Sequence, residues 1–278
     1  MMNKIQQRRE ECLLLEQEWI NSRLVPYQNK EELAERILTL LSSDRFQPPT
    51  CYLVEPPDYK GLNDINYQLF IPIMYLPDDH EIVSEILTVI GKTLEQTAKE
   101  GVSNPDKDNL VSNSFSLSGY FAFENLFEAV KDAAFRVISD VPLTAAGNSL
   151  MERMVLFEAF QGIRGYADTH KDVVLEAVEL ADEKEILIAP LIGTYAQLKD
   201  ERAIKNFIKY YAQANGQENF ARNGIDRSVS FMYLAYSIYK NFSEGAILNR
   251  HIYALTDQSM VEKLEDLFSN ERWKRMQD

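Results

Sequence analysis

The sequence predicts a mainly α-helical protein, built as a multi-helix bundle or as stacked helix pairs, with at most a small β-hairpin near residues 51–76. Apolar residues recur at helical spacing through most of the chain, and short polar connections separate these segments. The composition is that of an ordinary folded protein, with 45% hydrophobic and 26% charged residues. A chain of 278 residues is also long enough to bury a large core.

The first part of the chain predicts two helices that pair as an antiparallel hairpin. The first covers residues 3–23 and ends before Pro26. The second covers residues 30–42 and begins at Asn29, where Glu32 three residues later forms a pattern typical of a capping box. Four residues form the apolar stripe of this second helix: Leu33, Ile37, Leu40 and Leu41.

The next segment is where a hairpin could form. Residues 43–64 contain four prolines and few helix-forming residues, so they predict no regular helix, although residues 51–54 could form a short strand. Residues 66–76 are rich in β-branched and aromatic side chains, but Pro72 restricts them to an edge strand or an extended segment.

A helix is then expected from Asp78 or Asp79, as its N-cap, to about Lys99, with Gly101 at its C-cap. The polar residues 102–117 predict a long loop and a boundary between two lobes. The apolar stripe of the helix consists of Ile82, Ile86, Val89, Ile90 and Leu94.

The sequence therefore predicts an acidic N-terminal helical lobe at 1–101 and a C-terminal helical lobe at 118–278, which one continuous domain could also contain. Beyond the loop, almost every segment has helical periodicity. The expected helices cover residues 119–138, 145–164, 169–182, 185–198, 201–214, 227–241 and 258–274.

The net charge of −14 is concentrated in the first half of the chain. Residues 44–132 hold 15 Asp and Glu against 6 Lys and Arg, whereas residues 171–278 hold 17 against 14. An acidic surface repels phosphate backbones, so the charge argues against nucleic-acid binding and favours a basic protein partner.

Cysteine content and hydropathy predict a cytoplasmic protein without a cofactor. Cys12 and Cys51 have no paired spacing, which argues against a disulfide framework or a Cys-based zinc site. The first residues lack the apolar core of a secretory signal, and no apolar stretch is long enough to span a bilayer.

One run of polar residues contains the ligand types of a metal site: Asp78, Asp79 and His80, followed by Glu81. Consecutive helical residues point in different directions, so these side chains would not converge on one ion. Capping at the positive end of a helix explains the run, and we expect no metal there.

Any chemistry would have to use one of three histidines, His80, His170 and His251. His170 stands at another predicted helix start, and His251 lies beside an apolar stretch. A structural role explains each of them, but catalytic groups are assembled in space and need no linear motif.

The aromatic segment 231–239 is apolar around most of its circumference, unlike the amphipathic helices before it. It could be a central helix covered on several sides. Alternatively Tyr233 and Tyr236, together with Tyr210 and Tyr211, could line a groove for a partner peptide or helix.

Two classes of function follow. The first is a protein–protein interaction module, such as an adaptor, an immunity-type inhibitor protein or a helical effector, that uses its acidic surface or a helical groove. The alternative is a hydrolase or transferase with a His and carboxylate site between the two lobes. A structural subunit of an oligomer is a third, weaker hypothesis. The sequence leaves the partner, the substrate and the oligomeric state open.

Overall fold

A computed structural model confirms the mainly α-helical fold class. Within the part of the chain that it describes, the backbone forms helices, turns and bends and contains no strand. The chain divides into two compact units, unit 1 with residues 1–140 and 154–165, and unit 2 with residues 141–153 and 166–278. The structure describes residues 29–43, 69–70, 72–73, 76, 79–102, 108–140, 154–184, 186, 189–213, 225–242 and 246–269.

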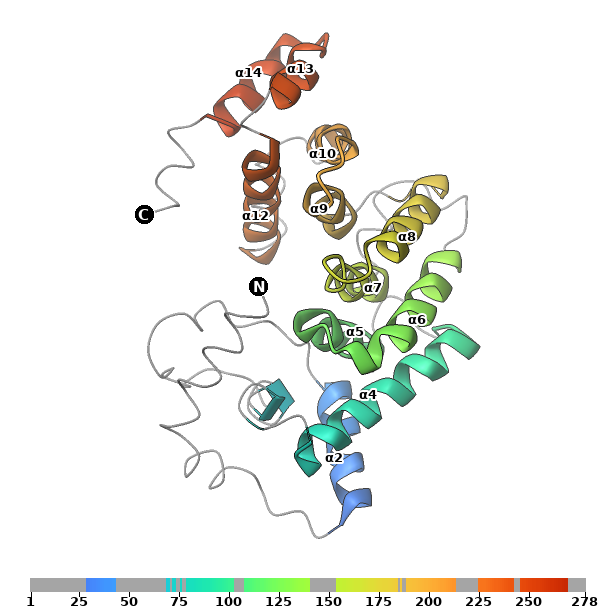
Figure 1. The fold of residues 1–278 in the computed structure, drawn as a ribbon. Coiled ribbons are helices and arrows are strands. Elements are labelled where there is room, and N and C mark those ends of the chain that lie inside the picture. Colours follow the sequence, from blue (N-terminus) through green and yellow to red (C-terminus); the bar gives the residue numbers. More distant parts are fainter. Residues whose placement is uncertain are drawn as a thin grey trace. The chain divides into compact units, whose positions relative to one another are not determined.

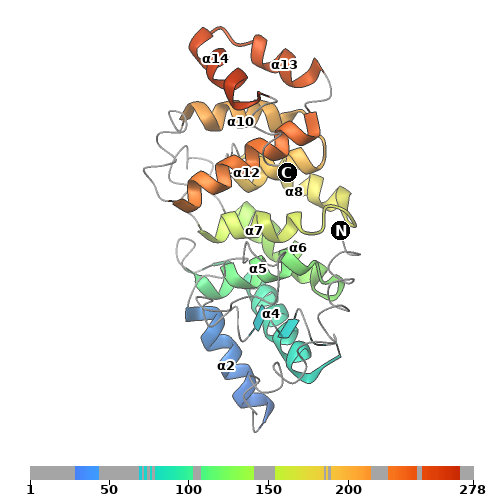
Figure 2. The ribbon, with the colours of Figure 1, turned by 90° about the vertical axis from the view of Figure 1, so that its left-hand side faces the viewer.

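Unit 1 is built from stacked helix pairs (Figures 1 and 2). Helix α4 packs on α5 and α6 packs on α7, while α4 also contacts α6 and α5 contacts α7. Helix α2 packs on α4 and α5. Its helices are α2 (Lys30–Ser43), α4 (Glu81–Glu100), α5 (Asn109–Phe121), the 3-10 helix η2 (Glu124–Leu126), α6 (Phe127–Ser139) and α7 (Met154–Arg164).

The amphipathic helices of unit 1 follow the predicted apolar stripes. All four stripe residues of α2 are buried, and Asn29 accepts a hydrogen bond from the Glu32 backbone at 2.8 Å. In α4 the stripe is buried except for Ile82, which is half-buried. Gly101 ends α4 with a φ of 76°, a left-handed conformation that suits glycine.

The N-cap of α4 was predicted incorrectly. His80, rather than Asp78 or Asp79, precedes the helix, and its Nδ1 accepts a hydrogen bond from the Ile82 backbone at 3.3 Å. The ring therefore serves the same purpose as a capping carboxylate, because it satisfies one of the free N–H groups at the helix start.

The loop predicted at 102–117 is wrong from residue 109 onward, because α5 begins at Asn109 and Asp108 caps it. Its short polar side chains do not disrupt the helix. Ser114 and Ser118 each donate to the carbonyl four residues earlier at 2.7 Å, which leaves no unpaired hydroxyl at these positions. The helix expected at 119–138 is accordingly divided into the end of α5, the η2 turn and α6.

Polar side chains of α5 also complete the end of α2. The Asn113 side chain is buried and donates from Nδ2 to the Leu41 carbonyl at 2.8 Å. Asn109 donates to the carbonyls of Ser42 and Ser43 at 3.5 and 3.3 Å. The last carbonyls of a helix lack partners within it, so side chains from a neighbouring helix take the role that a C-terminal glycine often has.

Helices α5 and α7 approach so closely that only glycine fits at their contact. A Cβ atom on Gly119 would lie 2.4 Å from the Gln161 carbonyl oxygen, and one on Gly165 would lie 2.0 Å from the Gly119 carbonyl oxygen. The two backbones therefore touch directly, without side chains between them.

The extended segment expected at 66–76 has helical backbone at residues 69–70 and 72–73. The Leu76 N–H donates to the Pro72 carbonyl at 2.9 Å. The predictions for residues 3–23, 43–64 (after Ser43) and 141–153 lie outside the described residues.

Unit 2 is also helical, and four of its helices match the predicted segments. The short α13 was missed, and α14 ends at Leu267 with Phe268 as its C-cap, whereas the prediction ran to residue 274. The helices are α8 (Lys171–Glu183), α9 (Ala189–Gln197), α10 (Arg202–Gln213), α12 (Ile225–Phe242), α13 (Ala246–Tyr253) and α14 (Gln258–Leu267).

Helix α9 packs on α8, α10 and α12, and α12 also packs on α10 and α13. Helix α12 carries the aromatic segment 231–239, in which the described side chains of Leu234, Ala235 and Ile238 are buried. Helix α13 contacts α10 and pairs with α14. Among the described helices, none has the length and apolar character that crossing a membrane requires.

Candidate functional site

The three histidines occupy different structural settings. His80 caps α4 with its Nδ1. His170 precedes α8, and its ring lies 6.3 Å from the buried ring of Tyr166, centroid to centroid. In the described chain no three His, Cys, Asp or Glu side chains gather as metal ligands would. Asp79 is exposed, and Asp78 lies outside the described residues.

His251 contacts a carboxylate. Its Nε2 lies 3.1 Å from Oε2 of Glu201, and Arg250 donates to the same oxygen at 2.7 Å. The hydrogen bond from His251 and then that from Arg250 lower the pKa of Glu201. These contacts connect α13 to the residue that precedes α10. The sequence could not reveal them, because Glu201 and His251 are 50 positions apart.

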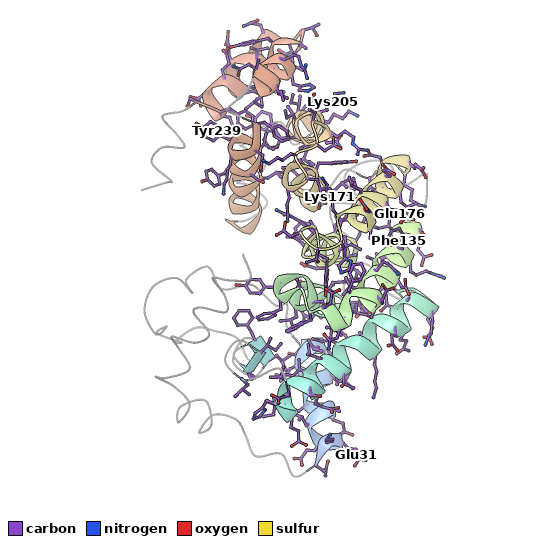
Figure 3. The ribbon with its side chains drawn as sticks, viewed as in Figure 1. Glu31, Phe135, Lys171, Glu176, Lys205 and Tyr239 are labelled. Atoms are coloured by element: carbon purple, nitrogen blue, oxygen red, sulfur yellow. The ribbon has the colours of Figure 1, made fainter. Side chains whose placement is uncertain are left out.

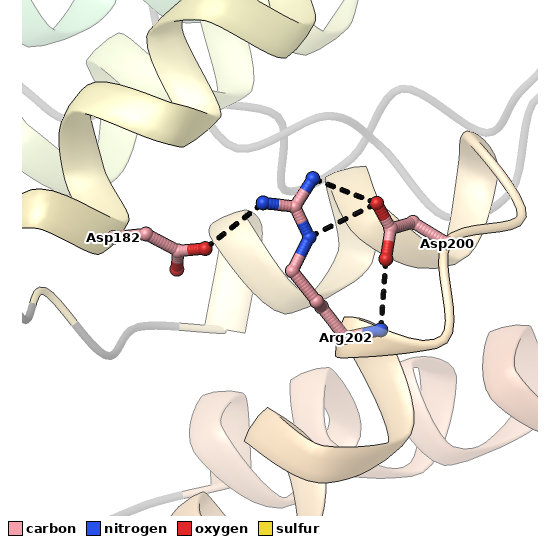
Figure 4. Close-up of polar contacts among 3 residues, drawn as sticks. All are labelled: Asp182, Asp200 and Arg202. Atoms are coloured by element: carbon pink, nitrogen blue, oxygen red, sulfur yellow. Dashed lines mark hydrogen bonds and ion pairs between the residues drawn. The ribbon is translucent and has the colours of Figure 1, made fainter.

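A second polar cluster surrounds Arg202, the next residue along the chain (Figure 4). Its guanidinium donates to Oδ2 of Asp200 from Nε at 3.0 Å and from Nη2 at 2.7 Å, and to Oδ2 of Asp182 from Nη1 at 3.1 Å. The Arg202 backbone N–H also donates to Asp200 Oδ1 at 2.9 Å. Asp200 therefore caps α10 and pairs with its first side chain.

The guanidinium also covers an aromatic ring, because its Cζ lies 4.6 Å from the ring centroid of Tyr195 in α9. Burial, and then the nearby Asp182 carboxylate, raise the pKa of Tyr195. Partial burial acts to raise the pKa of Asp200, but the hydrogen bonds from Arg202 outweigh it and the pKa is lowered. The cluster joins α8, α9 and α10, and we name its residues Asp182, Tyr195, Asp200 and Arg202 the Arg202 joint.

The predicted tyrosine groove receives little support. Tyr210 and Tyr211 are buried, with 7% and 5% of their surfaces exposed, and Tyr211 stacks on the buried Phe207. Tyr236 is half-buried in α12. Tyr233 belongs to the same helix, but its side chain lies outside the described ones. Two of these four rings therefore lie in the core of unit 2, where a partner would not reach them.

Carboxylates face outward over both units. Glu31 on α2 and Glu176 on α8 are exposed examples (Figure 3). Among the described Asp and Glu residues, Glu158 in α7 alone is buried, and it accepts a hydrogen bond from Ser116 in α5. The other described carboxylates are exposed or half-buried, and some of them, such as Asp182 and Asp200, pair with cations of this chain.

A partly exposed group of aromatic rings in unit 1 was not predicted. We name Phe70, Tyr120, Phe121 and Phe123 the aromatic ledge. Neighbouring ring centroids lie 5.1 to 5.3 Å apart. Phe70 is buried, Phe121 and Phe123 are half-buried, and Tyr120 is 36% exposed. The sequence signal is the cluster of three aromatic residues at 120–123.

The ledge lies where α5 ends, because Ala122 adopts a left-handed conformation with a φ of 49° and turns the chain into η2. Residues 109–130 contain Glu124 and Glu128 but no Lys or Arg. The ledge thus combines exposed aromatic surface with a locally acidic sequence. Comparisons with models of protein families, with curated proteins and with solved structures found no match for this chain.

Proposed function

We propose that this protein is a helical protein–protein interaction module whose acidic surface binds a basic protein partner. The outward placement of the carboxylates is the observation that carries this proposal. Among the described acidic residues only Glu158 is buried, so most of their carboxylates lie where a partner could meet them. Charge of one sign spread over a surface accelerates and selects association with a partner of the opposite sign.

The architecture supports the same proposal. Stacked helix pairs present rows of exposed side chains on neighbouring helices, and proteins built this way commonly use such surfaces for binding. In unit 1, α2 and α4 present exposed carboxylates at Glu31, Glu35 and Glu95. We use these three residues to test the proposal because they are far from the buried core.

The test has two steps. The tagged full-length chain is expressed in its native host, and the proteins that co-purify with it are identified and produced in pure form. The association rate constant of each purified candidate is then measured at increasing salt concentrations. We expect the rate constant to fall steeply as salt rises, because screening shortens the range of the attraction to about 10 Å at 0.1 M.

Two charge variants provide opposite expectations. Replacing Glu31, Glu35 and Glu95 by Gln should slow association, whereas replacing the exposed Lys30, Lys92 and Lys99 by Gln should accelerate it. Both sets lie on α2 and α4, so they are matched in position. A partner whose association ignores salt and both variants would contradict the proposal, as would the absence of any saturable partner.

An enzymatic function is the second candidate, favoured by the contact between His251 and Glu201. A carboxylate that orients a histidine is a recurring feature of general acid–base sites. If a reaction is found, His251→Ala should abolish turnover and leave the melting temperature almost unchanged. If the melting temperature falls together with the turnover, the role of His251 is structural, in the contact between α13 and Glu201.

A further inference from the structure

We infer that the aromatic ledge of unit 1 is a docking site for a protein segment that carries an apolar side chain flanked by lysine or arginine. This inference rests on the proposed function and names the site and chemistry of its partner. It starts from the way the ledge is built. Phe70 is 1% exposed, and its ring contacts those of Tyr120 and Phe121. Tyr120 makes edge contacts with Phe70 at 5.3 Å and with Phe121 at 5.1 Å, and these contacts hold it in place.

Such a surface suits an apolar side chain. Tyrosine and phenylalanine supply much contact area with few rotatable bonds, so little conformational entropy is lost when a partner binds. The half-buried Phe121 and Phe123 extend the exposed ring of Tyr120 by stacking at 5.3 Å from each other. An apolar residue of a partner would therefore contact rings that are already ordered.

The electrostatic surroundings favour a cation next to that apolar residue. Tyr120 and Phe121 are the last residues of α5, and the C-terminal end of a helix carries partial negative charge. Glu124 follows in η2 and is exposed. A lysine or arginine of a partner could approach this negative end while contacting the face of Tyr120, an additional favourable interaction.

The same charges argue against a second copy of this chain as the occupant. Two ledges brought together would place the negative ends of two α5 helices and two Glu124 side chains against each other. The whole chain carries a net charge of −14, so repulsion also opposes self-association at longer range. A basic segment of another protein avoids both costs.

The experiment uses three fluorescein-labelled peptides of equal length and the full-length protein, with binding followed by fluorescence anisotropy. The first peptide carries a central tryptophan and leucine flanked by lysines. The second keeps the lysines and replaces the apolar residues by serine. The third keeps the apolar residues and replaces the lysines by glutamate. We expect saturable binding of the first peptide, with the other two weaker by roughly tenfold or more.

The variants place the binding on the molecule. Tyr120→Ser and Glu124→Lys should each weaken the first peptide by about fivefold or more, because they remove an anchoring ring and reverse the local charge. Tyr253→Ser is the matched control, since Tyr253 is an exposed tyrosine in unit 2, with 62% of its surface accessible. This control variant should bind like the parent chain, and circular dichroism should show that all three variants keep their helical content.

The outcomes separate the ledge from the broader proposal. If the serine peptide binds as well as the first, charge alone drives association. The docking role of the aromatic ledge is then refuted, while the proposal of an acidic interaction module is not. If the glutamate peptide binds equally well, the charge argument fails for the ledge. Loss of binding in Tyr253→Ser, or concentration-dependent self-association that disappears in Tyr120→Ser, would also overturn the assignment of the ledge to a basic partner.

Discussion

Two helix contacts, one in each unit, are built in contrasting ways. In unit 1, α5 and α7 touch backbone to backbone through Gly119, Gly162 and Gly165. In unit 2, α8, α9 and α10 are joined by the long side chain of Arg202 and the carboxylates of Asp182 and Asp200. The first contact requires glycines, which have no Cβ atom, whereas the second requires a guanidinium and two carboxylates.

This difference predicts how each contact fails. The contact between α5 and α7 should tolerate changes of pH and salt but no added atom, because its partners are neutral and tightly packed. The Arg202 joint should respond to charge, since its charged groups Asp182, Asp200 and Arg202 are partly exposed and can rearrange. The predictions below test this contrast, beginning with the largest expected effect.

Gly165→Ala should be the most destabilising of these substitutions. Its new Cβ would lie 2.0 Å from the Gly119 carbonyl oxygen, a backbone atom that moves only if the two helices separate. Forced overpacking of this kind costs about 1–3 kcal/mol and occasionally more, and we expect a loss of about 3 kcal/mol or more. Urea denaturation followed by circular dichroism measures the change.

Gly91→Ala is the matched control, because it also adds one methyl group to a glycine of unit 1. The nearest atom to its Cβ would be Cδ2 of Leu126 at 3.3 Å, the end of a flexible side chain. Alanine is a better helix former than glycine by about 1 kcal/mol, so this variant should be as stable as the parent or more stable. Equal destabilisation by both variants would refute a special role for the α5 and α7 crossing.

Asn113→Ala should have the next largest effect. The Asn113 side chain is buried and donates to the Leu41 carbonyl at the end of α2, so its removal leaves a buried acceptor without that partner. Such a loss costs about 1–3 kcal/mol. Asn109→Ala removes longer and more exposed bonds to the same helix end, and its effect should stay within about 0.5 kcal/mol. Urea denaturation of both variants compares them directly.

The same contrast explains which parts of the fold the sequence could predict. Helices α2 and α4 have wide apolar stripes, and their buried residues match those stripes closely. Helix α5 contains Ser112, Asn113, Ser114 and Ser118 at buried positions, so hydropathy alone indicated a loop. The side chains of Asn113, Ser114 and Ser118 donate to carbonyls of α2 or of their own helix, and these partners exist only in the folded chain.

The candidate sites were harder to predict for a related reason. The partners of Arg202 and Glu201 include Asp182 and His251, which are 20 and 50 residues away. No local spacing identifies such pairs. The aromatic ledge did have a local signal at residues 120–123, but Phe70 joins it from a segment where Pro72 suggested an extended chain.

Arg202→Met should destabilise unit 2 moderately. Methionine keeps much of the apolar stem but removes the ion pairs to Asp182 and Asp200 and the contact with Tyr195. About a third of the arginine side chain is exposed, so solvent screening reduces the cost from the value for a buried pair to about 1–2 kcal/mol. Lys209→Met on the exposed side of α10 should change stability by less than about 0.5 kcal/mol. Thermal unfolding of both variants is measured at low and at high salt. High salt should reduce the destabilisation caused by Arg202→Met and leave that caused by Lys209→Met unchanged.

The smallest effect concerns pH, and it separates the two kinds of contact most directly. The pKa of Asp200 is lowered from its usual value of 3.8 by its bonds to Arg202, which outweigh the effect of partial burial. A lowered pKa contributes stability above the usual value, and this contribution is lost as the pH falls through the lowered value. Asp200→Asn should therefore destabilise the protein at pH 7 by about 1 kcal/mol or less, because the carboxylate is partly exposed.

Urea denaturation at several pH values tests this origin. The difference in unfolding free energy between Asp200→Asn and the parent should shrink below about pH 4. The difference caused by Asn113→Ala should not change with pH in this way, because neither Asn113 nor the Leu41 carbonyl titrates. A difference for Asp200→Asn that stayed constant from pH 7 to acid conditions would show that the Arg202 joint, like the glycine crossing, is held by packing.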